Sequence, residues 1–256
     1  MSTLEILLLA VLLPLFPASM LFNLLEQRIA APQGKAVLML AWSQLAAWAA
    51  QQIQTTPPDW VLYWALATAG VYAFRALVLN ELTTWSAFLF VSLLALFWLQ
   101  PVPEHSQWLH PLQALLLTAP ATLLNLLAAS LKNRFGTTYL GLVHGLVHGW
   151  PRLAALMVAC VLAIMATPPF PGFFFLLEQL GSLDLPMAGG VLLVWYLWGW
   201  AGLRLLQRLV LGQETTALDS TKADLPLLPS AGVFLLLLVL AISGLWMAVT
   251  MAGGAS

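Results

Sequence analysis

The chain has 256 residues, of which 61% are hydrophobic and only 7% are charged, whereas about a quarter of the residues in soluble domains are charged. So few charged side chains cannot cover a surface that faces water, and the composition therefore predicts a protein embedded mainly in lipid. The net charge of −1 argues against nucleic-acid binding, which requires clustered Lys and Arg. The single cysteine, Cys160, excludes an internal disulfide and any multi-cysteine metal site.

Apolar segments follow one another along the chain, and most approach the ~20 residues that a membrane-spanning helix needs. The clear segments are residues 4–24, 37–53, 60–79, 82–99, 111–131, 152–167, 189–211 and 231–250. A further stretch, 168–187, can cross a membrane only as a broken helix. We therefore predict an all-α, polytopic transmembrane bundle of eight or nine helices with one broken helix near 168–187. We expect a single integral membrane domain over residues 1–256.

The basic residues of the first two thirds predict the orientation. If the helices cross alternately, all of these residues fall on one side, which the positive-inside rule makes cytoplasmic. The loops at 54–59 and 100–110 contain no Lys or Arg, which agrees. Arg204, Arg208 and Lys222 reach the same side only if 168–187 adds no crossing of its own, so the orientation of the last third stays open. The basic residues that set the orientation are Arg28, Lys35, Arg75, Lys132, Arg134 and Arg152.

The end of the segment 152–167 carries the most specific local signal. Pro168, Pro169, Pro171 and Gly172 interrupt the apolar run, and the run then resumes and reaches Glu178. Backbone that breaks inside a bilayer must be shielded by protein or water. An ionisable side chain just after the break is a candidate functional group. Glu178 is therefore either a proton-accepting carboxylate in the membrane or a carboxylate in the interface beside the headgroups.

Few other polar side chains lie within the apolar segments. Arg204 and Arg208 are four residues apart and share a helix face, so they either pair with Glu178 or extend toward the headgroups as anchors. Gln113, Thr122 and Asn125 form a polar stripe on the segment 111–131. Such groups either hydrogen-bond a neighbouring helix or line a hydrated channel.

Two histidines stand four residues apart, at His144 and His148, between glycines. On a helix this spacing could present two imidazoles to a metal, but no third ligand stands beside them. Their unperturbed pKa near 6.5 suits a proton relay, and an interfacial turn is the third interpretation. The sequence thus predicts no metal site. It also contains no phosphate-binding loop and no bis-histidine pair deep in facing helices, so we expect no cofactor and no catalytic centre in this chain.

From about residue 145 onward the chain resembles the antiporter-like subunits. These are the proton-pumping membrane subunits of respiratory complex I, shared with multisubunit cation/proton antiporters and inorganic-carbon uptake systems. The resemblance is in the order and spacing of short motifs and divides the chain into N-terminal helices (1–110) and an antiporter-like C-terminal half (111–256). It rests on Gly145-Leu146, Trp150-Pro151, Ala166-Thr167-Pro168-Pro169, Gly172-Phe173, Arg204, Arg208 and Asp224-Leu225-Pro226.

The chain also departs from this family. Members of the family are about twice as long and contain two inverted repeats, whereas this chain has room for one. The family's broken-helix charge corresponds to Leu176 here, and Glu178 lies about 200° further around a regular helix. A lysine that the family often carries falls near Thr122, and the remaining charges of its proton path belong to the missing half.

The resemblance implies a membrane subunit of a multisubunit complex that couples proton or cation translocation to another process. That complex would be a complex I-like or antiporter assembly, or an inorganic-carbon uptake system with a soluble subunit, in a bacterial inner membrane. In this hypothesis Glu178 accepts and releases a proton, Arg204 or Arg208 modulates its charge, and His144 and His148 lie near the entrance. The alternative is a non-conducting subunit that braces a conducting partner, and a second chain could supply the missing repeat. The expected partners are other membrane subunits, a soluble or peripheral catalytic subunit, lipid, and protons or cations.

Overall fold

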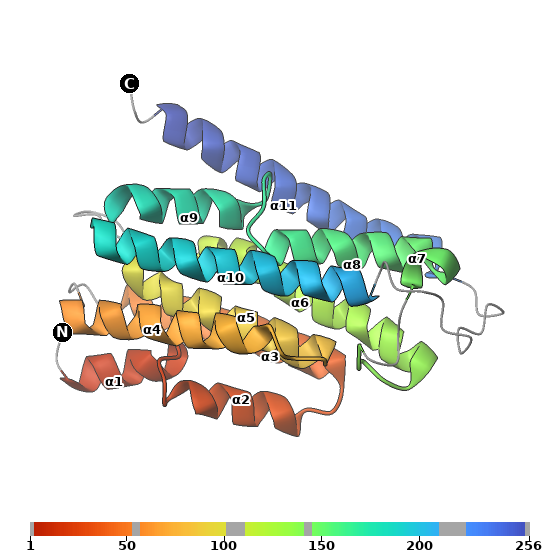
Figure 1. The fold of residues 1–256 in the computed structure, drawn as a ribbon, viewed down its shortest axis with the longest axis horizontal. Helices are drawn as coiled ribbons and strands as arrows, with labels where there is room; N and C mark the ends of the chain where they lie inside the picture. Colours follow the sequence, from red (N-terminus) through yellow and green to blue (C-terminus); the bar gives the residue numbers. More distant parts are fainter. Residues whose placement is uncertain (1–2, 53–56, 101–110, 141–144, 210–223, 254–256) are drawn as a thin grey trace.

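The computed structural model describes residues 3–52, 57–100, 111–140, 145–209 and 224–253, which form a bundle of roughly aligned helices (Figure 1). One continuous hydrophobic core extends from Leu9 near the start of the chain to Leu240 near its end. The prediction of an all-α membrane bundle is confirmed. The helices are α1 (Thr3–Leu12), α2 (Ser19–Arg28), α3 (Pro32–Gln51), α4 (Asp59–Ala76), α5 (Leu82–Leu96) with a 3-10 turn (Phe97–Leu99), α6 (Pro111–Phe135), α7 (Leu146–Gly149), α8 (Pro151–Ile164), α9 (Pro171–Ser182), α10 (Leu185–Leu209) and α11 (Leu227–Gly253).

Four of these helices have the length and hydropathy of membrane-spanning helices: α5 with its 3-10 turn, α6, α10 and α11. The helices α3 and α4 contain 20 and 18 residues, which is also close to the ~20 residues that span a bilayer. Such apolar helices make the chain an integral membrane protein. Most of α5 is buried inside the bundle, whereas most of α11 is exposed and leaves the bundle at an angle (Figure 1).

The first predicted segment, 4–24, is not one continuous helix, and this second break was not expected from the sequence. Pro14 and Pro17 lie between α1 and α2, and proline both lacks an N–H and clashes with the preceding turn of a helix. The freed backbone groups need partners, because lipid offers none. Side chains from three other helices supply them, through Trp42 Nε1 to Leu12 O (2.9 Å), Trp98 Nε1 to Leu13 O (2.9 Å), Trp64 Nε1 to Phe16 O (2.6 Å) and Phe16 N to Thr68 Oγ1 (3.2 Å).

The predicted break after 152–167 is present, and it separates α8 from α9. Their 14 and 12 residues correspond to about 21 Å and 18 Å of helix, so neither alone crosses a hydrocarbon core of about 30 Å. In Figure 1 the two helices lie end to end and together extend along the bundle, so we count them as one crossing. Pro168 and Pro169 lie within the break, and Pro171 and Gly172 begin α9.

This arrangement shows which end of the bundle Arg204 and Arg208 reach, a point that the sequence left open. Because α8 and α9 form one crossing, α10 runs back to the end of the bundle from which α8 started (Figure 1). Arg208, in the last turn of α10, and Arg204, one turn earlier, therefore lie at the same end as Arg28 and Arg152. The positive-inside rule predicts that this is the cytoplasmic end, and we refer to it by that name.

The two breaks share a sequence pattern. Residues 14–18 read Pro-Leu-Phe-Pro-Ala, and residues 168–172 read Pro-Pro-Phe-Pro-Gly. Both pair prolines with an aromatic residue and then a small residue that begins, or nearly begins, the second helix. This short internal repeat was the signal that could have predicted the first break.

Candidate functional site

A buried ion pair connects α2 and α3 close to the cytoplasmic end. Lys35 Nζ lies 2.5 Å from Glu26 Oε1, and the two side chains are 9% and 2% exposed. The turn before Pro32 folds α3 back against α2, which brings together two charges that are nine residues apart in sequence. No described residue donates a hydrogen bond to Glu26 Oε1, so the contact is an ion pair of imperfect hydrogen-bond geometry. Charged groups buried in a membrane protein are costly and are candidates for function.

Lys35 is linked further to Glu81, which immediately precedes α5. Lys35 Nζ donates to Thr83 Oγ1 (3.2 Å), and Thr83 Oγ1 donates to Glu81 Oε1 (2.8 Å). Thr84 and Thr138 also donate to the Glu81 carboxylate, at 2.8 Å and 3.4 Å. We call Glu26, Lys35, Glu81, Thr83 and Thr138 the ionic cluster.

The protonation of Glu81 follows from these contacts. Burial alone acts to raise its pKa, but the hydrogen bonds from Thr83 and Thr84, the charge of Lys35 and the hydrogen bond from Thr138 outweigh burial. The pKa of Glu81 is therefore lowered from 4.5, and the group is ionised at neutral pH. The cluster thus combines one lysine with two carboxylates, an arrangement in which a proton or a cation can be held between acidic groups.

A line of polar side chains continues from the ionic cluster between α3, α5 and α6. Asn125 lies at its centre, completely buried, and donates to Ser86 Oγ (2.6 Å) and to Ala121 O (3.0 Å). Further along, Thr118 Oγ1 lies 3.2 Å from Ser43 Oγ. We call Ser43, Ser86, Thr118, Thr122 and Asn125 the polar line.

The chain of hydrogen bonds along the polar line is interrupted at two points. Asn125 Oδ1 is buried and accepts no hydrogen bond from the described residues, which is unusual for a buried side-chain acceptor. Met39 lies between Lys35 and Ser43 on the same face of α3, and its sulfur is 3.3 Å from Asn125 Nδ2. A thioether cannot carry a proton, so transfer from the ionic cluster to Asn125 would need water beside Met39.

Two of the predicted site residues, Thr122 and Asn125, belong to this line. Thr122 is buried and donates to Thr118 O (3.2 Å) within α6. The structure thus shows that both residues face the interior, where Asn125 bonds a neighbouring helix through Ser86.

The structure does not bring the other predicted residues together. Glu178 is exposed on α9, whereas its neighbour Gln179 is buried and donates to Leu96 O (2.9 Å). Leu176, at the position of the family's charge, is completely buried. About 28 Å of helix separates the start of α10 at Leu185 from Arg204, so neither arginine of α10 lies beside Glu178.

The arginines and histidines have separate surroundings. Arg208 donates to Asn80 Oδ1 in the turn between α4 and α5, and Arg204 is half-buried on α10. His148 is exposed in α7, and His144 lies outside the described residues. Within the described ranges no group of three His, Cys, Asp or Glu side chains could hold a metal ion.

The sequence interpretation missed the ionic cluster. The sequence places Lys35 only on the cytoplasmic side, and no prediction from it concerns Glu26 or Glu81. A usable signal was present, because Glu81 is followed by Thr83 and Thr84, whose hydroxyls can bond a preceding carboxylate. The partnership of Glu26 with Lys35 depends on how α2 packs against α3 and has no sequence signal of its own.

Comparison with solved structures identifies the same fold in two kinds of membrane complex. A chain of respiratory complex I from Thermus thermophilus with bound NADH superposes with a TM-score of 0.74 at 23% identity, covering 92% of this chain and 52% of that chain. A chain of the Mrp complex from Dietzia sp. DQ12-45-1b gives 0.75 at 17% identity, covering 94% and 55%. A complex I structure from Thermus thermophilus with bound aureothin gives 0.61 at 17% identity, covering 82% and 49%.

These likenesses concern the fold, and the chain spans about half the length of the solved chains it matches. The sequence matches no protein-family model, and no curated protein matches it. The fold expected from the resemblance to antiporter-like subunits is therefore confirmed.

Proposed function

We propose that this chain is a membrane subunit of a multisubunit complex that couples proton or cation translocation to another process. Its fold is similar to that of chains in a respiratory complex I and in an Mrp complex. The observation that carries the proposal is the buried Glu26–Lys35 pair, which continues through Thr83 to Glu81. Membrane proteins retain such buried charges mainly along ion pathways and proton relays.

In this proposal the ionic cluster exchanges ions with the cytoplasm. Lys35 lies between Glu26 and Glu81, which it reaches through Thr83, and these three side chains would form the group at which the ion enters. The polar line carries the ion onward past Asn125 and Thr122, with water beside Met39. The chain would act in a bacterial inner membrane together with other membrane subunits, one of which would supply the missing half of the fold.

The residues predicted from sequence keep proposed roles in this scheme. Glu178 is exposed on α9, so it would accept and release a proton at a surface shared with a partner subunit. His148 would act near the cytoplasmic entrance, together with His144. Arg204 and Arg208 would act at that end, far from Glu178. A soluble subunit, as in an inorganic-carbon uptake system, remains one form that the coupled process could take.

The second candidate is a non-conducting subunit that braces a conducting partner. One observation favours it: Leu176 is buried and apolar where the related fold usually carries a charge, and Glu178 points outward. A brace would need the helices but not the charges of the ionic cluster. Substitution of those charges separates the two candidates.

The test is ion translocation by the intact complex in membrane vesicles, followed with a pH-sensitive or cation-sensitive dye. The charge-neutral double variant Glu26→Gln/Lys35→Met should assemble and lose most of its translocation. It is preferred to either single variant, because removing one partner of a buried pair leaves an uncompensated charge that costs about 3–5 kcal/mol. Arg28→Gln, an exposed cation at the end of α2, is the matched control and should translocate normally.

Normal translocation by an assembled double variant would exclude the ionic cluster from the pathway and favour the brace. Glu178→Gln is tested in parallel. Loss of coupled transport with intact assembly is expected if Glu178 exchanges protons, and unchanged transport would remove it from the scheme.

A further inference from the structure

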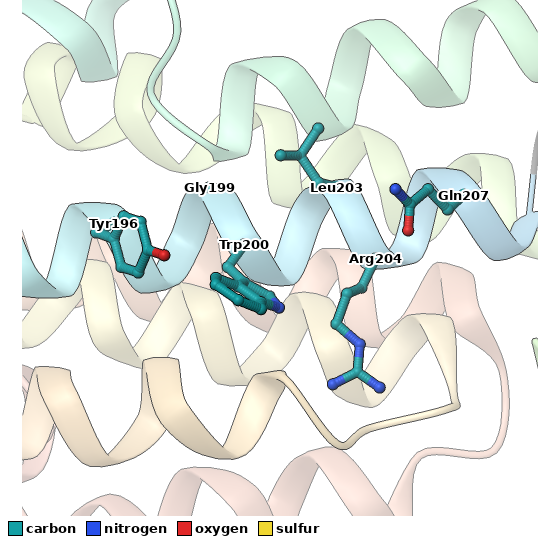
Figure 2. A pocket seen from close by; sticks show the side chains of 6 residues that line it. All are labelled: Tyr196, Gly199, Trp200, Leu203, Arg204 and Gln207. Atoms are coloured by element: carbon teal, nitrogen blue, oxygen red, sulfur yellow. The ribbon is translucent and has the colours of Figure 1, made fainter.

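The outward face of α10 contains a hollow of about 660 Å³ that includes no residue of the ionic cluster or the polar line. This volume is within the range of small-ligand sites, roughly 300–1,000 Å³. Its described lining comes entirely from α10 and is shown in Figure 2. The lining residues are Tyr196, Gly199, Trp200, Leu203, Arg204 and Gln207.

The hollow is apolar along most of its length and cationic at its cytoplasmic end. Tyr196, Trp200 and Leu203 are 59%, 50% and 55% exposed. Gly199 leaves open space between them, since a Cβ there would meet no atom within 4 Å. Arg204 lies five residues before the end of α10, about 8 Å along the helix, which places its guanidinium within reach of the headgroup layer.

Three of the polar side chains lie along one side of α10, whereas Gln207 lies on the other side of the helix (Figure 2). Figure 2 shows that Tyr196 turns its hydroxyl toward Trp200, and that Trp200 turns its indole nitrogen toward Arg204. The two rings pack edge to face with their centroids 5.8 Å apart. No described residue forms a hydrogen bond or ion pair with Arg204, the cation at the mouth of the hollow.

We propose that this hollow binds one anionic phospholipid from the cytoplasmic leaflet. The phosphate would bind Arg204 and the Trp200 N–H, while one acyl chain would lie past Gly199 toward Tyr196. Basic pockets on the cytoplasmic side of membrane proteins take anionic headgroups. A helix of a partner subunit fits less well, because close helix packing in membranes uses small residues rather than exposed Trp, Tyr and Leu.

The test is native mass spectrometry of the full chain in mild detergent, with phosphatidylglycerol and phosphatidylcholine of identical acyl chains as probes. The wild type should retain one phosphatidylglycerol under activation that removes phosphatidylcholine. Arg204→Gln should weaken phosphatidylglycerol binding by about fivefold, the effect of one basic residue near an anionic headgroup. Arg204→Lys should keep most of the preference, and Trp200→Leu should reduce binding of both lipids.

Arg28→Gln is the matched control, because it removes an exposed cation from the same end of the bundle but outside the hollow. An equal loss of binding in Arg28→Gln, or equal retention of the two lipids by the wild type, would overturn the proposal. A photo-reactive residue at position 203 gives an independent result in intact membranes. A lipid adduct supports the proposal, and an adduct to a membrane protein contradicts it, whatever the outcome for ion translocation.

Discussion

The two helix breaks both free backbone groups within the membrane, and different contacts stabilise each break. At the first, between α1 and α2, three tryptophan indoles and a threonine hydroxyl bond the freed backbone groups. At the second, between α8 and α9, Trp195 Nε1 donates to Met165 O (3.1 Å), and glycines of α10 and α11 pack directly on the break. The first break is held mainly by hydrogen bonds from side chains, and the second mainly by the close approach of other helices.

Close packing at the second break predicts the largest effect for Gly244→Leu. A Cβ at position 244 would overlap the carbonyl oxygen of Pro169 and lie 2.8 Å from the carbonyl carbon of Phe170. Backbone atoms cannot move aside as a flexible side chain can, so α11 must shift. We expect a loss of about 3 kcal/mol, at the upper end of ordinary overpacking costs, measured by thermal unfolding in detergent.

Gly232→Leu is the control on the same helix, because a Cβ at Gly232 would meet no atom within 4 Å. Equal stability losses in both variants would show that leucine is harmful anywhere on α11. The proposed contact with the break would then be unimportant.

Hydrogen bonding at the first break predicts a smaller but measurable loss of stability for Trp98→Phe. The substitution keeps an aromatic ring in the buried site but leaves Leu13 O without the indole donor. A buried polar group that loses its partner costs roughly 1–3 kcal/mol. Trp48→Phe, on an exposed part of α3, should change the unfolding temperature little. If the two variants unfold alike, the indole bond contributes nothing measurable to the first break.

Backbone strain at the second break predicts the smallest change in stability, and here the substitution should stabilise the protein. Ala166 has a φ of 53°, in the left-handed region that costs a non-glycine residue roughly 1–2 kcal/mol. Ala166→Gly should therefore raise stability by up to about 1 kcal/mol after the entropy of glycine is subtracted. Ala163→Gly, three residues earlier within α8, should lower stability by a similar amount, so two decreases would contradict the assignment of strain.

The sequence predicted the second break and not the first for a physical reason. Four breakers lie close together at 168–172 and divide the run into pieces too short to span alone. Pro14 and Pro17 instead lie in the middle of an apolar run of full membrane length. The length of that run therefore predicts one continuous helix despite the two prolines. The Pro-X-Phe-Pro pattern common to both segments would have corrected this.

The candidate site was less predictable than the fold. Thr122 and Asn125 were identified because a polar stripe is visible on an apolar helix, and the structure places both in the interior. Glu178 was emphasised because it follows the break, yet it is exposed. Its neighbour Gln179 faces the core instead, since adjacent residues on a helix point about 100° apart.

Composition and the lengths of apolar runs determined by themselves that this is a helical membrane protein, because so few charges cannot cover a water-facing surface. The distribution of Lys and Arg determined the orientation of the first two thirds. Only the tertiary structure decided which charges are buried, joining Glu26 to Lys35 and leaving Glu178 outside. The burial of a side chain depends on the helices packed around it, and a single sequence does not state which helices those are.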